Sequence, residues 1–245
     1  MDADVWLVCC CEKEAPLQSR IWIMTLVFVL VSSAAFPADL SEKVADRLFE
    51  ASKVLDELVN APDGGIPKNL LHNAECVAVI PGVKKLALGF GVRYGSGAVS
   101  CRKDQGKGPW GPPSIITLGG GSFGFQVGGQ AIDVVMLLMR PDSIRYLLRD
   151  KVTLGADVEA AAGPIGRAAS AETSVSFRAE ILTYSRSRGL FGGISLGGAV
   201  VRPDSAANKT LYKREVTAKE LLEEGNVMVP EAADKFIQAL TRSGS

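Results

Sequence analysis

The clustering of glycine constrains the fold of this chain more than any other feature of its sequence. Thirteen of the 26 glycines fall between Gly89 and Gly129, and five more fall between Gly189 and Gly198. Glycine weakens a strand, because it increases the entropy of the unfolded chain and contributes no side-chain packing. We therefore expect a geometric reason for so many glycines in strand-like segments. The favoured reason is a strongly curved sheet or partly open barrel with bulges, and the alternative is a groove lined by bare backbone.

Apolar periodicity predicts helices at both ends of the domain and short strands between them. Helices are predicted over 39–60, 68–74, 141–148, 217–224 and 230–240, and strands over 76–80, 86–100, 114–118, 131–139, 175–184 and 190–201, with a turn at Pro81–Gly82. The spacing Thr217 to Glu220 is that of a capping box. Long crossover helices are absent between most of these strands, which favours antiparallel pairing. The predicted class is α+β, with one mainly antiparallel, glycine-rich and strongly curved sheet flanked by N- and C-terminal helices.

Residues 20–38 have the pattern of a secretory signal peptide. Arg20 precedes eleven uncharged residues from Ile21 to Val31, and small residues follow up to Ala38. Cleavage after Ala35 or Ala38 predicts an exported chain, periplasmic or secreted. An uncleaved membrane anchor is the alternative, since this stretch is just long enough to span a bilayer. Residues 1–19 are interpreted as a non-native or disordered extension, and residues 39–245 as a single domain.

Charge and cysteine content exclude several classes of function. Lys+Arg and Asp+Glu both number 27, and this balance argues against nucleic-acid binding, which needs a basic excess. The single histidine, His72, excludes metal sites that need two histidines. After residue 38 the only cysteines are Cys76 and Cys101. We expect them to be buried free thiols, and one disulfide in an oxidising compartment is the alternative.

The glycine-rich segments also match motifs of enzymes. Residues 119–124 fit GxGxxG, but no helix-forming stretch follows, which argues against a dinucleotide site. Ser122 and Ser195 each stand in a GxSxG stretch. A hydrolase elbow of this kind requires a histidine later in the chain, whereas His72 precedes both serines. We therefore expect no catalysis and no cofactor, with a serine hydrolase as a minor alternative.

Two carboxylates stand among apolar or glycine-rich neighbours. Asp133 interrupts the apolar run from Ala131 to Met139, and Asp157 follows Leu154-Gly-Ala. A carboxylate in such surroundings needs a partner. An arginine or backbone N–H groups would serve, and a calcium or magnesium site that uses both carboxylates is the alternative.

Several stretches, in order along the chain, resemble those of the SYLF-domain family of lipid-binding domains. They are Ile66–Leu71, Ala78–Pro81, Gly89–Gly95, Gly121–Gly128, Gly155–Asp157, Ala162–Gly166 and Tyr184–Phe191, within a resemblance that covers about Val44 to Leu240. The resemblance implies binding of phospholipid without catalysis. In eukaryotic relatives it also implies phosphoinositide preference and, for some, actin binding. A single domain behind a signal segment is similar to the secreted bacterial members.

Together with this resemblance, the basic residues predict where lipid phosphate binds. The candidates are Lys84, Lys85, Arg93, Arg186 and Arg188. Arg186 and Arg188 are two residues apart, so on a strand they project from one face and can hold one phosphate. A charged, solvated strand edge is the alternative, and the lipid site would then lie near Lys84, Lys85 and Arg93.

The sequence thus predicts an exported, membrane-associated module that binds anionic phospholipid. Two alternatives from other classes remain open. One is a structural protein of the cell envelope that pairs with another chain through its glycine-rich sheet. The other is a metal-dependent or serine lipid hydrolase.

Overall fold

A computed structural model of the chain describes residues 40–61, 65–104, 106–165, 179–187 and 190–244. It describes the backbone alone at 87–90, 122–128 and 190–191. The chain divides into Met1–Ala38 and Asp39–Ser245, and the architecture below belongs to the second unit. The predicted extension and signal segment, and part of the strand predicted over 175–184, lie outside the described residues.

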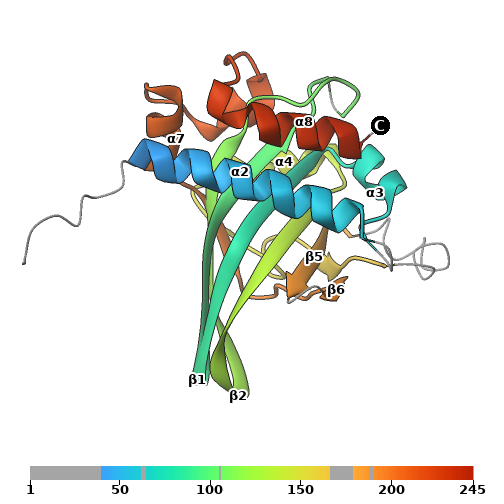
Figure 1. Cartoon of the computed structure of the whole chain (residues 1–245), viewed down its shortest axis with the longest axis vertical. Coiled ribbons are helices and arrows are strands. Elements are labelled where there is room, and N and C mark those ends of the chain that lie inside the picture. The colour runs from blue at the N-terminus through green and yellow to red at the C-terminus, as the bar shows by residue number, and fades with distance from the viewer. Residues whose placement is uncertain (1–39, 62–64, 105, 166–178, 188–189, 245) are drawn as a thin grey trace, which may run out of the picture. The chain divides into compact units, whose positions relative to one another are not determined.

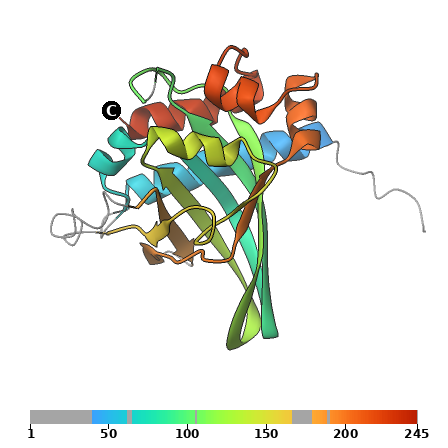
Figure 2. The same ribbon diagram turned by 180° about the vertical axis from the view of Figure 1, so that it is seen from behind.

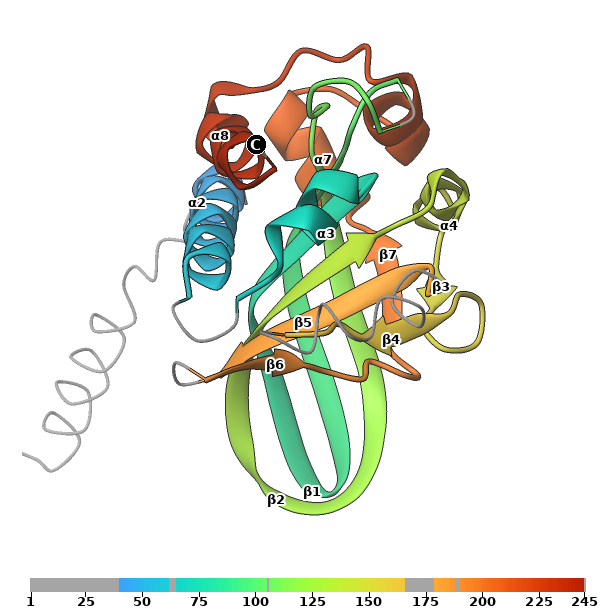
Figure 3. The same cartoon turned by 90° about the vertical axis from the view of Figure 1, so that its right-hand side faces the viewer.

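One long two-stranded ribbon forms the centre of the fold. Strand β1 (Cys76–Cys101) and strand β2 (Ser114–Leu138) pair antiparallel along their whole length, from Cys76 opposite Leu138 to Val99 opposite Ser114. The ribbon is folded back on itself, with β2 outside β1 at the bend (Figure 3). The two ends of β1 therefore meet, and a disulfide joins Cys76 to Cys101 across a Cα–Cα distance of 4.0 Å.

This disulfide corrects the expectation of free thiols. The two cysteines are 25 residues apart, so the bond closes the whole of β1 into a loop. On the chain-entropy estimate, closing a loop of this length stabilises the folded state by about 3.5 kcal/mol. Periodicity alone did not reveal the pair, because its two members face each other only after the strand has bent.

The bend leaves a signature in the register of the ribbon. On β1 one residue separates Leu88 from Phe90, whereas on β2 three residues separate their partners, Val127 and Phe123. The outer strand of a bent ribbon follows the longer arc and needs the extra residues. The register shift is thus the bulge expected of a strongly curved sheet.

A second bulge lies at Pro81–Gly82, where the sequence predicts a turn. Pairing continues on either side, from Ile80 opposite Val134 to Val83 opposite Ile132. Gly82 has a φ of +56°, which a residue with a side chain adopts only with strain. The stretches 76–80 and 86–100 are consequently one strand, not two, and 114–118 and 131–139 likewise merge into β2.

Five short strands extend the two arms of the ribbon into a seven-stranded sheet within the described residues. Strands β5 (Ile181–Ser187) and β7 (Val200–Pro203) pair with the second and first halves of β2. Beyond them lie β3 (Val152–Thr153), β4 (Ala160–Ala162) and β6 (Leu190–Gly193). Only β4 is parallel to its neighbour within the described part, so the predicted mainly antiparallel, curved α+β sheet is confirmed.

The helices gather at the end of the ribbon away from the bend, as Figures 1 and 2 show. They are α2 (Leu40–Val59), α3 (Lys68–Asn73), η1 with α4 (Pro141–Ser143 and Ile144–Leu147), α7 (Ser205–Tyr212), the π-helical turn η2 (Glu220–Glu224), η3 (Glu231–Ala233) and α8 (Asp234–Ser243). The predicted capping box is present, with the Thr217 N–H donating to Glu220 at 2.7 Å. Helix α7 was not predicted. The single strand expected over 190–201 is wrong, because the structure has two strands there, β6, which pairs with β5, and β7, which pairs with β2. Within the described residues, no helix is both long and apolar enough to cross a membrane.

The sheet separates two hydrophobic cores. On one face, Val77, Val79 and Leu137 pack against α2, α3, α7 and α8. On the other face, Ala78, Ile80 and Met136 pack with residues of α4, β3, β7 and η2. Adjacent residues of a strand point to opposite faces, so this division assigns every side chain of the ribbon to one face or the other. We call them the helix face and the open face.

Glycine allows the two arms of β1 to touch. A Cβ placed on Gly97 would lie 2.0 Å from the carbonyl oxygen of Val79, and one on Gly95 would lie 2.7 Å from the Val83 side chain. Backbone meets backbone at Gly97, so no rotamer change can make room. Close approach of two backbones therefore accompanies the predicted curvature as a reason for the glycines.

This contact predicts that Gly97→Ala destabilises the protein strongly. The added methyl group must push apart two backbones that lie between two packed cores, and overpacking of this kind costs at least about 2 kcal/mol. Gly192→Ala is the matched control, because a Cβ at Gly192 meets nothing within 4 Å. Urea denaturation should show the loss for Gly97→Ala and a change within about 0.5 kcal/mol for the control. Equal stabilities of the two variants would contradict the close approach.

Candidate functional site

A small cavity opens on the open face of the sheet, between the arms of the ribbon. It has a volume of about 250 Å³, and two of the predicted basic residues, Lys85 and Arg93, contribute to its wall. Its lining residues are Val83, Lys85, Arg93, Gln130, Ile132, Ser185, Ser187, Ile194, Ser195 and Leu196. Cavities that enclose a whole drug-sized molecule measure roughly 300–1,000 Å³. This one is suited to a head group rather than to a complete ligand.

The bend of β1 brings the two cations together. Lys85 lies four residues before Gly89 and Arg93 four residues after it, so each stands at the same level on its own arm. Lys85 is paired with Gln130, and Arg93 is paired with Gly120. Two residues that are eight apart on an extended strand would be separated by about 26 Å, so only the fold-back allows them to share a cavity.

Arg93 is the most notable group in this cavity. Its Nε atom is buried and has no hydrogen-bond partner among the described residues. A buried donor without a partner costs free energy, roughly 1–3 kcal/mol for a neutral group and more for a charged one. An anionic acceptor that enters the cavity would satisfy it.

Hydroxyl and apolar groups complete the wall. Ser187 accepts a hydrogen bond of 2.6 Å from the Gln130 amide, and Ser185 and Ser195 add two further hydroxyls. Val83, Ile132 and Leu196 provide apolar surface beside them. Two cations, several hydroxyls and an apolar side can together bind an acid or phosphate ester attached to an apolar group.

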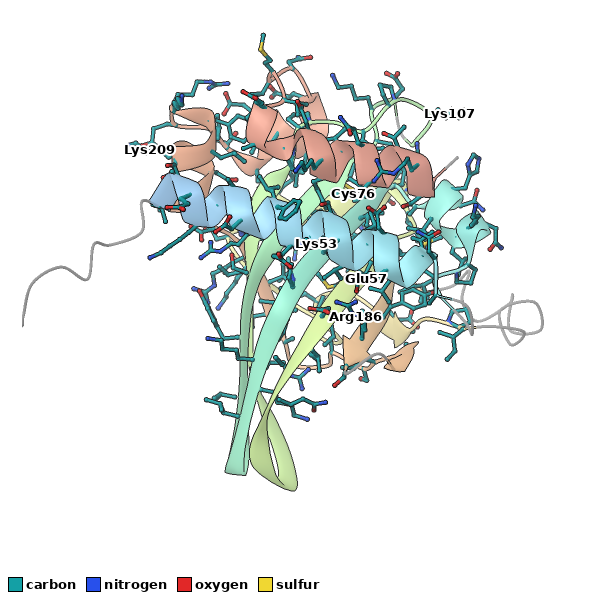
Figure 4. All side chains as sticks on the ribbon, in the orientation of Figure 1. Lys53, Glu57, Cys76, Lys107, Arg186 and Lys209 are labelled. Carbon is teal, nitrogen blue, oxygen red and sulfur yellow. A yellow bond between two sulfur atoms is a disulfide. The ribbon has the colours of Figure 1, made fainter. Side chains whose placement is uncertain are left out.

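The structure places Arg186 on the opposite, helix face. It lies directly across from Asp133 in the pairing of β5 with β2, and its Nε and Nη2 atoms lie 2.8 and 2.7 Å from Asp133 Oδ2. It also forms an ion pair with Glu57 of α2, and Figure 4 shows these two residues next to each other. Both side chains of the Arg186–Asp133 pair are less than a quarter exposed. Arg186 is therefore half-buried rather than part of a solvated edge.

The other predicted basic residues lie apart from the cavity or outside the description. Lys84 is exposed and precedes Lys85, so it points to the helix face. Arg188 lies outside the described residues. Of the five candidates, the structure thus brings Lys85 and Arg93 together.

Asp133 and Asp157 each have partners of the kind that a lone carboxylate requires. Asp133 accepts from the Gly82 N–H at 2.9 Å, in addition to its contact with Arg186. Burial raises the pKa of the Asp133 carboxyl, and the Gly82 hydrogen bond opposes that shift. Asp157 accepts from the Thr153 N–H at 2.7 Å, which lowers the pKa of its carboxyl. No group of three or more metal-ligating side chains occurs within the described residues, so a metal site at these aspartates stays a prediction.

The residues of the hydrolase alternative are placed on different sides of the sheet. Ser195 is exposed and lines the cavity on the open face. His72 lies in α3, whose leucines belong to the core of the helix face, and its Nδ1 lies 2.9 Å from the carbonyl oxygen of Gly244. The side chain of Ser122 lies outside the described residues.

One buried charged cluster was missed by sequence reasoning. Glu75 is only 7% exposed, and Arg102 stacks over Trp110 at 4.3 Å from the ring centre. Burial raises the pKa of Glu75, and the charge of Arg102 acts against that shift. Glu75 precedes Cys76 and Arg102 follows Cys101, so the disulfide brings the pair together. The sequence signal for this pair is that Glu75 and Arg102 are each next to a cysteine. It indicates an ion pair only after Cys76 and Cys101 are known to be joined.

The fold and the cavity define an α+β domain whose curved sheet holds a cationic, partly apolar site. Comparison with known families gives this class a name. The profile of the family described as "Ysc84: Las17-binding protein actin regulator" matches residues 119–243. The chain belongs to this Ysc84 family, which confirms the SYLF resemblance.

Similar proteins occur in fungi and animals. The chain is 39% identical over 178 residues to an SH3 domain-containing protein of Schizosaccharomyces pombe, covering 71% of this chain and 40% of the relative. It is 36% identical over 199 residues to Protein YSC84 of Saccharomyces cerevisiae, covering 78% and 42%. It is 33% identical over 199 residues to SH3 domain-containing YSC84-like protein 1 of Mus musculus, covering 78% and 57%. The chain thus spans about half the length of these relatives.

The position of Arg186 predicts that its main contribution is to stability. Arg186→Gln leaves Asp133 half-buried without its cation, which should lower the free energy of unfolding by about 1–3 kcal/mol. The control is Lys53→Gln, which loses an exposed ion pair with Glu50 and should cost less than about 1 kcal/mol. Urea denaturation of both variants measures the difference. If Arg186→Gln were as stable as the control, the ion pair would contribute nothing measurable.

Proposed function

We propose that this protein is a lipid-binding module that recognises anionic phospholipid and catalyses no reaction. The observation that supports it most is the cavity on the open face, where Lys85 and the buried, unsatisfied Nε of Arg93 meet an apolar wall. A phosphate provides the anionic acceptor that Arg93 lacks among the described residues. The glycerol and first acyl carbons would lie along the apolar residues.

Family membership supports the same proposal. The family is described as a Las17-binding actin regulator, and the SYLF resemblance of the sequence implies binding of phospholipid without catalysis. Actin binding is proposed only for the eukaryotic relatives. For this chain we propose a membrane surface as the partner, with phosphoinositide-type head groups as one lipid class to test.

Co-sedimentation with vesicles tests this function. Unaltered protein should bind vesicles that contain phosphatidylglycerol or phosphatidylinositol phosphate, and should bind pure phosphatidylcholine weakly. Arg93→Gln and Lys85→Gln should each weaken binding about tenfold, since a hydrogen bond to a charged group contributes about 1.5–3 kcal/mol. Arg202→Gln is the control, because it removes an exposed cation of β7 that does not line the cavity. Its affinity should change less than twofold.

Three results would overturn this assignment or the site on which it rests. Equal binding to neutral and anionic vesicles, or none to either, would exclude an anionic head group as the ligand. Retained binding in Arg93→Gln, with loss of binding in a folded Arg186→Gln/Arg188→Gln variant, would place the phosphate at that strand, as the spacing of the two arginines predicts. Circular dichroism of each variant shows whether its fold is intact.

We further propose that the protein is exported to an oxidising compartment, periplasmic or extracellular. The signal-like pattern of residues 20–38 supports it. The pairing of Cys76 with Cys101 gives independent support, because disulfides persist in such compartments and are rare in the cytosol.

Mass analysis of protein recovered from the exported fraction tests this location. We expect a mature N-terminus between Phe36 and Leu40, and no alkylation of Cys76 or Cys101 until a reductant is added. Because both sulfurs are buried, the protein is unfolded in denaturant before alkylation, so that burial cannot mimic a disulfide. An N-terminus upstream of Arg20, or two reactive thiols without reductant, would contradict the proposal.

A further inference from the structure

We propose that the bend of the β1–β2 ribbon inserts into one leaflet of an anionic bilayer, with Lys84, Lys85 and Arg93 at the level of the phosphates. This inference deepens the proposed lipid-binding function and rests on it. It concerns the projecting end of the ribbon, residues 84–94 and 119–131, which includes Lys85, Arg93 and Gln130 of the cavity wall and continues beyond them to the bend. We call this segment the ribbon tip.

The ribbon tip extends beyond the rest of the domain. All three views show β1 and β2 continuing past α2, β5 and β6 to a bend that no other element covers (Figures 1, 2 and 3). Nearer the helices, the same ribbon is buried on both faces. The chain therefore builds about half of its longest strands outside its own cores.

Apolar side chains are exposed on the helix face of this tip. Leu86, Val92 and Tyr94 are 59%, 59% and 60% exposed. Their partners on β2 are all glycines, namely Gly129, Gly121 and Gly119, which provide no side chain to cover them. These three residues make up half of the exposed large hydrophobic residues of the described chain, and they share one face of one ribbon. Exposed apolar side chains on one face of a projecting element mark an interaction surface.

The order of residues away from the bend is that of a membrane-inserted element. From residue 87 to residue 91, and from 119 to 129 on β2, the sequence has no charge. Leu86 and Val92 stand three residues from Gly89, Lys85 and Arg93 four, and Lys84 and Tyr94 five. On β1, apolar residues thus come first, followed by cations and a tyrosine. Tyrosine and long basic side chains are the residues that favour the interface between acyl chains and water.

The dimensions fit a single leaflet. Four residues of strand extend about 13 Å, which is the distance along the ribbon from the bend to Lys85 and Arg93. Half of the hydrocarbon core of a bilayer is about 15 Å thick. With the bend near the middle of the bilayer, the two cations would reach the phosphates. Along the tip, β1 and β2 satisfy each other's backbone groups on the edge that they share, which lowers the cost of taking this ribbon out of water.

Charge favours a bilayer over a second copy of the chain as the occupant of this surface. Neither β1 nor β2 up to Ile132 contains an acidic residue, whereas the tip has three cations. Two tips placed together would bring six like-charged side chains close, and neither tip has an acidic residue in its sequence. An anionic membrane provides that counter-charge as well as an apolar phase.

The test combines binding with a measurement of depth on the full-length protein. Val92→Asp/Tyr94→Asp, and separately Leu86→Asp, should weaken binding to phosphatidylglycerol vesicles at least tenfold. Met228→Asp is the matched control, because Met228 is 87% exposed and lies outside the ribbon. Its affinity should be unchanged. Folding should persist in all these variants, since the replaced side chains are exposed, and circular dichroism verifies this.

Depth is read from Val92→Trp and Tyr94→Trp in vesicles with brominated acyl chains. After subtraction of the unaltered protein's signal, Val92→Trp should be quenched strongly by bromine in the acyl chains, and Tyr94→Trp, at the level of the head groups, should be quenched less. Normal vesicle binding without quenching, and without loss in the aspartate variants, would overturn the insertion while leaving head-group binding intact. No binding by the unaltered protein would overturn both proposals. Self-association without vesicles that disappears in Val92→Asp/Tyr94→Asp would identify a second copy as the occupant.

Discussion

The contact between the two arms of β1 is the constraint on which the rest of this structure depends. Gly97 lies against the backbone of Val79, and the Cys76–Cys101 disulfide joins the ends of the same strand. A ribbon folded back in this way has one face for the helices and another for β3, β7 and α4, and therefore two cores. It also brings Lys85 to Arg93. A side chain at Gly97 would disturb packing and site together, because both follow from one close approach.

Sequence reasoning predicted the elements better than their connections. The apolar stripe of α2 and the Thr217–Glu220 capping box are local patterns, and the structure contains both. Pro81–Gly82 is read locally as a turn, yet it is a bulge, because β2 continues to pair across it. Helix α7 depends on a distant contact. Asn208 is buried in this helix and accepts a hydrogen bond of 2.7 Å from the Ile115 N–H of β2. This contact with β2 explains why a polar residue occupies a buried position of the helix.

The candidate site was predicted in part, and parity along the strands explains the difference. All the candidate cations are strand residues, so their faces follow from odd or even position once the two bulges are located. The bulge at Pro81–Gly82 shifts that parity by one, and it places Lys85 rather than Lys84 on the open face. Arg186 meets Asp133 across 53 residues of sequence. That separation hides the pair from any local pattern, although an arginine partner for Asp133 was one of the options considered.

The same pair shows how a chain without net charge can present a cationic end. Asp133 is the first acidic residue on β2, and Arg186 forms ion pairs with it and with Glu57 of α2 at the edge of the helix layer. Between that level and the bend, the charged residues in the sequence of the ribbon are Lys84, Lys85 and Arg93, which are all cationic. Electrostatic attraction over one Debye length, about 8 Å at physiological salt, depends on these local charges and not on the total. The balance of 27 basic and 27 acidic residues therefore excludes a general polyanion binder, but it does not exclude a surface that meets anionic lipid at one end.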